Sequence, residues 1–335
     1  MRKTAAALAL VLIASLGIIV PSVTAAVGDP KVVIIVGATH GTTARYRADA
    51  DVAYAEAIKY TSNVVKVYSP NATWAKVKAA VVGASVVIYM GHGNGWPSPY
   101  RYDAKYTTKD GFGLNETAGA GDYNNKYYGE PYVSSLDLAP KAIVLLHHLC
   151  YASGNSEPGK AEPTVTVARQ RADNYAAGFL KAGAAAVLVD GHAGAERYLR
   201  ALFTTHQSIE RMWRTMPNAN DNVVSFPSVR TTGATVHQDP NSPTSGFYRS
   251  LAVATFGVTT DEVVSAESLS KAPRLRIYQP GLPRSSGAMT NIAPRAYRVT
   301  ARLASSGGAG SISLPVVGYD VLGAAQATVK AYPPH

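Results

Sequence analysis

The sequence has little cysteine. Its 335 residues include a single one, Cys150. One cysteine cannot form an internal disulfide, which excludes the class of exported proteins that disulfides hold together. The thiol is therefore a small buried side chain, an intermolecular link or a reactive group. It stands in "KAIVLLHHLCYASG" (141–154), directly after an apolar run and two histidines.

Long apolar runs are absent beyond the first residues. The chain opens with "MRKTAAALALVLIASLGIIVPSVTAA", a short positive stretch followed by an apolar one (5–20) and small residues. This is the form of a signal peptide, which we assign to 1–26. No later segment is apolar for long enough to span a bilayer. We therefore expect a secreted or extracellular protein with no membrane span after signal cleavage.

Dense runs of one charge sign are also missing. The formal net charge is +10 at pH 7, but the 32 lysines and arginines are scattered along the chain. Proteins that follow a nucleic-acid backbone concentrate their positive charge, so we expect no nucleic-acid partner. We interpret the charge as a solvated surface that favours association with an anionic cell envelope.

Signatures of metal and cofactor binding are missing as well. No two histidines stand four residues apart, as they would to share a metal on one helix face, and no Gly-x-Gly-x-x-Gly loop occurs. His147 and His148 are neighbours on a predicted strand, where successive side chains point to opposite faces. We therefore expect no metal site and no cofactor.

Short apolar runs alternate with helical patterns through most of the chain. The runs that predict buried strands are 31–38, 63–69, 85–93, 141–150 and 184–192. The segments that predict helices are 44–60, 71–83, 166–183 and 194–216. Continuously apolar strands that alternate with helices predict an α/β fold, in which a mostly parallel sheet is sandwiched by helices.

We expect this α/β domain to span 30–260. A segment at 94–140, rich in tyrosine, interrupts the alternation and predicts an ordered insertion. The insertion is either a surface excursion packed by its own rings or a flap that contacts substrate. Strand patterns between Pro- and Gly-rich turns predict a small β-rich C-terminal module at 270–335.

His92 and Cys150 each stand at the end of a predicted strand. Active sites of parallel sheets lie beyond the carboxyl ends of the strands, so the two side chains are candidates for one site. A thiol attacks as the thiolate, and a nearby imidazole can take its proton. Gly93 lacks a Cβ, so its N–H and that of Cys150 can approach a substrate oxyanion. We interpret His92 as the base and Cys150 as the nucleophile.

These blocks resemble the caspase–legumain–gingipain clan of cysteine peptidases. "VVIYMGHGNG" is similar to the histidine block of that clan, "AIVLLHHLCYASG" to its cysteine block and "YRADADVAYAEA" (46–57) to a legumain segment. The resemblance implies a caspase-like fold. It implies a secreted cysteine endopeptidase in which His92 and Cys150 cleave peptide bonds through a thioester acyl-enzyme. Protein or peptide substrates are the partners that it implies.

The resemblance also implies a pocket for the substrate side chain before the scissile bond. Arg47, together with His148, would favour a carboxylate or carboxamide there. Asp190, at the end of the fifth predicted strand, would instead favour Lys or Arg, or would serve only to order a loop. His148 and Leu149 depart from the family pattern, which is small at position 149. These departures leave a non-catalytic caspase-fold binding protein at the cell envelope as the alternative.

Overall fold

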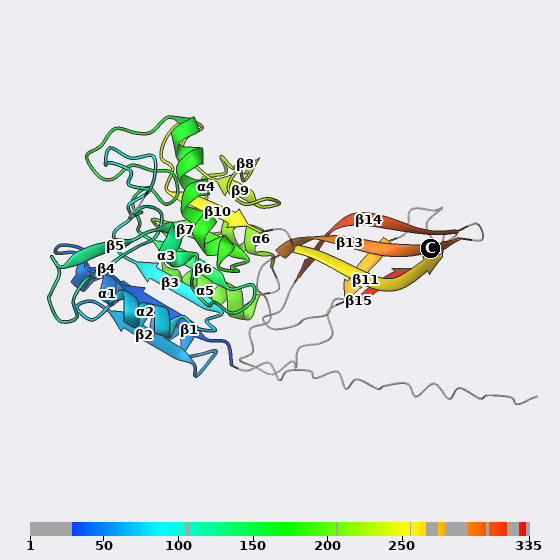
Figure 1. Cartoon of the computed structure of the whole chain (residues 1–335), viewed down its shortest axis with the longest axis horizontal. Coiled ribbons are helices and arrows are strands. Elements are labelled where there is room, and N and C mark those ends of the chain that lie inside the picture. The colour runs from blue at the N-terminus through cyan, green and yellow to red at the C-terminus, as the bar shows by residue number, and fades with distance from the viewer. Residues whose placement is uncertain are drawn as a thin grey trace, which may run out of the picture.

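A central sheet of eight strands organises the larger part of the protein (Figure 1). The structure is a computed structural model, and it describes residues 29–104, 107–205, 207–254, 256–265, 274–278, 294–305, 308–319 and 328–332. The strand order is β2-β1-β3-β6-β7-β10-β9-β8. The predicted signal peptide at 1–26 lies outside the described residues.

Five neighbouring strands of this sheet are parallel. They are β1 (Val32–Val36), β2 (Val64–Tyr68), β3 (Val86–Met90), β6 (Ile143–His147) and β7 (Ala186–Asp190). Three antiparallel strands extend the sheet: β10 (Arg249–Val253), β9 (Thr235–Gln238) and β8 (Val224–Pro227). Each of the five predicted strands coincides with one of the parallel strands to within a few residues.

Helices cover both faces of the sheet. One face carries α1 (Thr43–Ala57), α5 (Ala195–Thr204) and α6 (Ile209–Arg214). The other carries α2 (Trp74–Ala80), α3 (Glu130–Val133) and α4 (Val165–Lys181). Along β1, Val33 and Ile35 join one apolar core and Ile34 joins the other, because successive strand side chains alternate. The predicted α/β class, with a mostly parallel sheet between helices, is confirmed.

The insertion at 94–140 is anchored to the sheet. It contains α3 and an antiparallel hairpin of β4 (Phe112–Asn115) and β5 (Asn125–Tyr128). The Tyr89 hydroxyl of β3 accepts a hydrogen bond from the Gly113 N–H (2.8 Å) and donates to the Gly113 carbonyl (2.9 Å). The Phe112 ring is fully buried in the core. The hairpin is thus fixed beside the carboxyl end of β3.

Two details differ from the sequence expectation. The single helix expected over 194–216 is two helices, because the chain turns between α5 and α6 and Ser208 caps the second by accepting from the Arg211 N–H (3.0 Å). The strands β8 and β9 were not expected. Apolar and polar side chains do alternate along β8, but over only four residues that end in Pro227, and a proline within a short run argues against a strand.

The C-terminal part of the chain contains strands only, among the residues that are described. β11 (Phe256–Ser265), β13 (Pro294–Ser305) and β14 (Gly308–Tyr319) form one sheet, and β12 (Arg274–Tyr278) pairs with β15 (Thr328–Tyr332) (yellow to red in Figure 1). The division into a domain at 30–260 and a module at 270–335 stays a prediction. Within the described ranges, no helix combines the length and apolar character needed to cross a membrane.

Candidate active site

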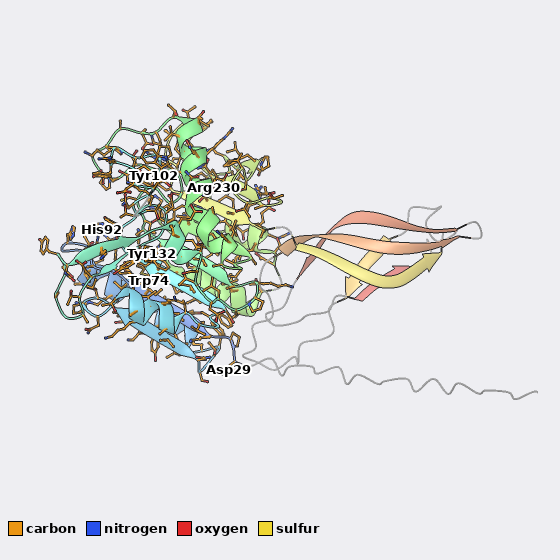
Figure 2. The ribbon with its side chains drawn as sticks, in the orientation of Figure 1. Asp29, Trp74, His92, Tyr102, Tyr132 and Arg230 are labelled. Atoms are coloured by element: carbon orange, nitrogen blue, oxygen red, sulfur yellow. The ribbon has the colours of Figure 1, made fainter. Side chains whose placement is uncertain are left out.

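The loops that follow β3 and β6 leave the same edge of the sheet side by side. The two strands pair in parallel, with Met90 opposite His147, so their carboxyl ends are level. His92 lies two residues beyond β3, and Cys150 lies three residues beyond β6. Figure 2 shows His92 beyond the arrowhead of β3, at the end of the domain where β4 and β5 lie. Sheet topology therefore places both predicted catalytic residues at one edge.

Gly93 makes the closest approach between these two loops. A Cβ built on Gly93 would overlap the Cys150 carbonyl oxygen and lie 2.8 Å from the Cys150 backbone nitrogen. Every residue other than glycine carries that Cβ, so this approach requires glycine. Because His92 directly precedes Gly93, the contact holds the histidine loop against the cysteine loop. The structure thus brings Gly93 against the backbone of Cys150, with His92 next to Gly93 in the chain, and the catalytic roles of these residues stay a prediction.

His92 is packed between the loop after β1 and the hairpin of the insertion. Its ring centroid lies 4.7 Å from that of His40, and a Cβ built on Gly113 would lie 3.3 Å from the His92 Cβ. Its Nε2 atom is buried and has no hydrogen-bond partner among the described residues. Burial, and then the nearby His40, lower the pKa of His92. The imidazole is therefore neutral at neutral pH, which is the form that accepts a proton.

Cys150 is half-buried and free. Burial, and then the negative charge of Glu157, raise the pKa of the Cys150 thiol to about 11. Glu157 also accepts a hydrogen bond from the Tyr100 hydroxyl of the insertion (2.6 Å). At neutral pH the Cys150 thiol is therefore protonated and the imidazole on the adjoining loop is neutral, and thiolate forms only as a base removes the proton.

Two backbone donors stand free of backbone partners at this point. Neither the Gly93 N–H nor the Cys150 N–H donates to another backbone group within the described part of the chain. Both belong to the loops that Gly93 brings into contact. The sequence predicts that these two N–H groups stabilise a substrate oxyanion. Backbone N–H groups without a backbone partner are suited to that role.

The two histidines before Cys150 differ from the expectation of opposite strand faces. β6 ends at His147, and His148 has a left-handed backbone (φ 59°). The turn stacks the two rings, with centroids 4.0 Å apart, and the Tyr46 ring stacks on the other side of His148 at 5.7 Å. Burial, and then His147, lower the pKa of His148 to about 4. No group of three or more His, Cys, Asp or Glu in the described residues is placed to hold a metal.

A cavity of about 400 Å³ opens beside His148, between the start of α1 and the loop after β7. Arg45, His147, His148, His192 and Glu196 are among the residues that line it. Its lining residue His148 is two residues from Cys150 in the chain. The arginine that lines this cavity is Arg45.

Arg47, the residue that the sequence places in the pocket, lies elsewhere. It is exposed on α1, and its Nη1 atom is 3.4 Å from the carbonyl oxygen of Ser69, beyond the end of β2. Residues two apart on a helix do not share a face, so only one of Arg45 and Arg47 can point to the cavity. The spacing of the two arginines was visible in the sequence, but the direction of each depended on where α1 begins.

Asp190 has no exposed surface. Its carboxylate accepts from the N–H groups of His192 (2.8 Å) and Ala193 (3.0 Å) and from the Tyr198 hydroxyl (2.6 Å). The buried Arg249 guanidinium also faces it, at 3.4 Å. These donors occupy the lone pairs of the Asp190 carboxylate. The hydrogen bonds from His192 and Ala193 order the loop after β7. We therefore leave Asp190 out of the substrate pocket.

Leu149 packs into the apolar core on the α4 side of the sheet, with 4% of its surface exposed. This explains a large residue where the family resemblance expects a small one. Two other residues contribute to the site, His40 and Glu157. The sequence places His40 near the end of the first predicted strand without giving it a role in this site, whereas Glu157 lies in a loop that carries no such signal.

Comparison with solved structures gives a loose structural likeness. The X-ray structure of a secreted C11 cysteine protease from Bacteroides thetaiotaomicron, in complex with an irreversible peptide inhibitor, matches with a TM-score of 0.34 and 13% sequence identity. The match covers 63% of this chain and 66% of that one. Neither a protein-family model nor a curated protein matches the chain. A likeness this loose assigns no activity.

The contact between Gly93 and Cys150 predicts the effect of one added methyl group. Gly93→Ala forces the two loops apart, so we expect a loss of about 1–3 kcal/mol in the free energy of unfolding and a changed rate of Cys150 alkylation. Gly191→Ala is the matched control, because a Cβ there would meet only ordinary contacts at 3.7 Å or more. Urea unfolding and iodoacetamide labelling measure both effects. Equal unfolding free energies and equal labelling rates in the two variants would contradict the close approach of Gly93 to Cys150.

The charge of Glu157 predicts a second change. Glu157→Gln removes a negative charge that disfavours the thiolate, while a Gln oxygen still accepts from Tyr100. The thiol pKa should fall, so iodoacetamide should label Cys150 faster at pH 8, measured by intact mass on a chain with a single thiol. Glu162→Gln, in the same loop, is the control and should leave the rate unchanged. A native rate for Glu157→Gln would refute the electrostatic assignment.

Proposed function

We propose that the protein is a cysteine endopeptidase that acts through His92 and Cys150. The observation that carries the proposal is the contact of Gly93 with the backbone of Cys150, which sets a neutral imidazole residue beside the loop of the lone thiol. Base, nucleophile and two candidate oxyanion donors then occupy one sheet edge. Secretion and the family assignment belong to the same proposal and rest on the sequence.

The chemistry proposed is acyl transfer in two steps. His92 takes the proton from the Cys150 thiol as sulfur bonds to the peptide carbonyl carbon, and the oxyanion is held by the Gly93 and Cys150 N–H groups. The tetrahedral species collapses, the amine leaves with the proton from His92, and a thioester remains. Water then attacks the thioester and passes a proton to His92. The carboxylate product leaves and the thiol is restored.

The pKa values favour a general base over a resting ion pair. Burial raises the pKa of the Cys150 thiol to about 11 and lowers that of His92, so the neutral pair is the stable form in the free protein. The proton therefore moves during attack, when the N–H groups share the developing negative charge. In this scheme His92 must be unprotonated, so activity is lost as the pH falls through its pKa.

The cavity beside His148 is the proposed pocket for the substrate side chain. In this pocket Arg45, and not the predicted Arg47, contacts the substrate side chain. Its guanidinium suits a carboxylate or a carboxamide. Asp49, on the same helix, lies 3.9 Å from Arg45 in an exposed ion pair, which is weak enough to exchange for a ligand. We propose cleavage after acidic or carboxamide residues.

The alternative, a non-catalytic binding protein at the cell envelope, has one observation in its favour. The raised thiol pKa describes a cysteine that is mostly protonated and hence weakly reactive by itself. The two functions differ in how the thiol responds to a bound peptide. A peptidase aligns a peptide electrophile with Cys150, whereas a binding protein does not.

A panel of peptidyl acyloxymethyl ketones should therefore modify Cys150 of the folded chain, as detected by intact mass. His92→Ala should slow the modification about 10²–10⁴-fold, because the proton acceptor is lost. Cys150→Ala is the control for labelling at other residues. If the folded native chain resists every member of a panel that varies all side-chain classes, the binding-protein alternative holds.

Specificity should depend on Arg45 and not on Arg47. In a fluorogenic peptide library, Arg45→Ala should lower kcat/KM for Asp, Glu, Asn or Gln before the scissile bond by about tenfold or more, the equivalent of one lost charged hydrogen bond. Arg47→Ala is the matched control, two residues along the same helix, and should keep the native profile. Cleavage only after Lys or Arg would refute the proposed pocket.

A further inference from the structure

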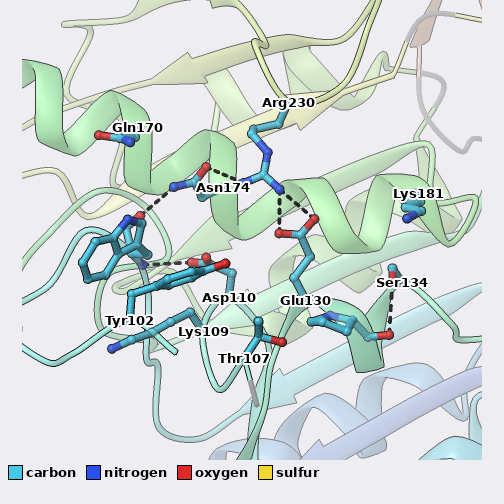
Figure 3. A pocket seen from close by; sticks show the side chains of 12 residues that line it. Tyr102, Thr107, Lys109, Asp110, Glu130, Ser134, Gln170, Asn174, Lys181 and Arg230 are labelled. Carbon is cyan, nitrogen blue, oxygen red and sulfur yellow. Dashed lines mark hydrogen bonds and ion pairs between the residues drawn. The ribbon is translucent and has the colours of Figure 1, made fainter. Parts of the chain in front are cut away.

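A second and larger cavity lies along the outer side of α4, away from His148. It is a groove of about 730 Å³ between α4 and the insertion. Figure 3 shows Gln170 and Lys181 at its two ends, with α4 along one wall. At 1.5 Å per residue, this part of the helix is about 16 Å long. The groove therefore fits an extended ligand rather than a single compact group.

The end of the groove near Gln170 presents aromatic rings over polar groups. The Trp96 and Tyr102 rings lie 5.2 Å apart, and 44% of Tyr102 is exposed. Below them Asp110 is 3% exposed, with the Trp96 N–H donating to its Oδ1 atom at 3.1 Å. That is the one hydrogen bond to this carboxyl group from the residues that the structure describes. A nearly buried carboxyl group thus lines the cavity.

The groove combines paired polar groups with positive charge. Arg230 and Glu130 form a two-pronged ion pair with both distances at 2.7 Å, and Arg230 also donates to the Asn174 Oδ1 atom (2.8 Å). Burial raises the pKa of Asp110 to about 8, so this group is mostly protonated at neutral pH. A protonated carboxyl both donates and accepts a hydrogen bond. Two lysines, Lys109 and Lys181, also line the groove and add positive charge.

The described lining does not suit a peptide. Among the lining residues that the structure describes, Pro131 is the one aliphatic side chain, so they form no apolar pocket for a peptide side chain. None of these described residues lies on a strand, so they offer no strand edge for pairing with an extended peptide backbone. They offer aromatic faces, hydroxyls, amides, a neutral carboxyl group, an ion pair and two ammonium groups. Hexopyranose rings match this set, because they expose C–H faces to aromatic rings and hydroxyls to polar groups.

We propose that the α4 groove, lined by Trp96, Tyr102, Asp110, Glu130, Asn174 and Arg230, binds an oligosaccharide through ring contacts and hydrogen bonds. A sugar ring lies against Tyr102 and Trp96, and its hydroxyls bond to Asp110 and to the Arg230–Glu130 pair. This binding uses neither His92 nor Cys150. It is therefore independent of the proposed peptidase activity, and either can fail without the other.

Calorimetric titration of the full chain with cellotriose, maltotriose and tri-N-acetylchitotriose tests the proposal. We expect saturable binding of at least one, weakened about tenfold or more by Tyr102→Ala. Trp96→Ala should weaken it likewise, since the Trp96 contacts to Asp110 and Asn174 are made by its backbone and survive the change. Tyr102→Ala should keep the native unfolding midpoint, because 44% of Tyr102 is exposed, and both variants are titrated at a temperature where calorimetry shows them to be folded.

Tyr123→Ala is the matched control. Tyr123 is 83% exposed on the same insertion but stacks on His40, outside the groove, so its loss should leave sugar binding unchanged. Failure of all three trisaccharides to bind at millimolar concentration would overturn the proposal. So would binding that Tyr102→Ala and Trp96→Ala both leave intact. Binding of a sulfated oligosaccharide alone, lost on adding salt, would show a polyanion site instead.

Discussion

The candidate site depends on one backbone contact, that of Gly93 with Cys150. It exists because β3 and β6 are adjacent, parallel and level at their carboxyl ends, so their two exit loops begin side by side. The loop after β1, which carries His40, and the loop after β7, which Asp190 orders, leave the same edge. The strand order reverses between β1 and β3, so this is the edge at which an open parallel sheet is expected to bind its ligands.

Burial determines which ionisable groups at this edge of the sheet are neutral. It penalises the charged form of each group, so it raises the pKa of the Cys150 thiol and lowers that of His92 at once. Neighbouring charges have the same effect. Glu157 raises the pKa of the thiol, and His40 lowers the pKa of the imidazole. A resting ion pair would need the opposite surroundings. Any catalysis here must therefore supply the missing stabilisation through the bound substrate and the two N–H groups.

The sequence predicted the parts of the fold that follow from local pattern. Strands buried on both faces show continuous apolar runs, so β1, β3, β6 and β7 were recognised, and the strand-end rule then paired His92 with Cys150. The direction of Arg45 and Arg47 depends on the first turn of α1, which no pattern specifies to one residue. The backbone of His148 is left-handed and turns the chain out of its strand. The sequence around His148 carries no pattern that predicts this turn. Glu157 reaches the site through a loop and gives no periodic signal.

The segment after β3 connects the two sites proposed for this chain. It begins with His92 and Gly93 at the cysteine loop and continues to Trp96 in the α4 groove. Between them, the Asn94 carbonyl accepts from the Asp110 N–H (2.9 Å), and its side chain accepts from the buried Lys109 ammonium (2.7 Å). Asn174 of α4 holds the Trp96 carbonyl at 2.8 Å. A segment tied at both ends to a helix and to the insertion has little freedom to move. The proposed role of His92 as a base needs that rigidity, because one glycine contact holds its loop against the cysteine loop.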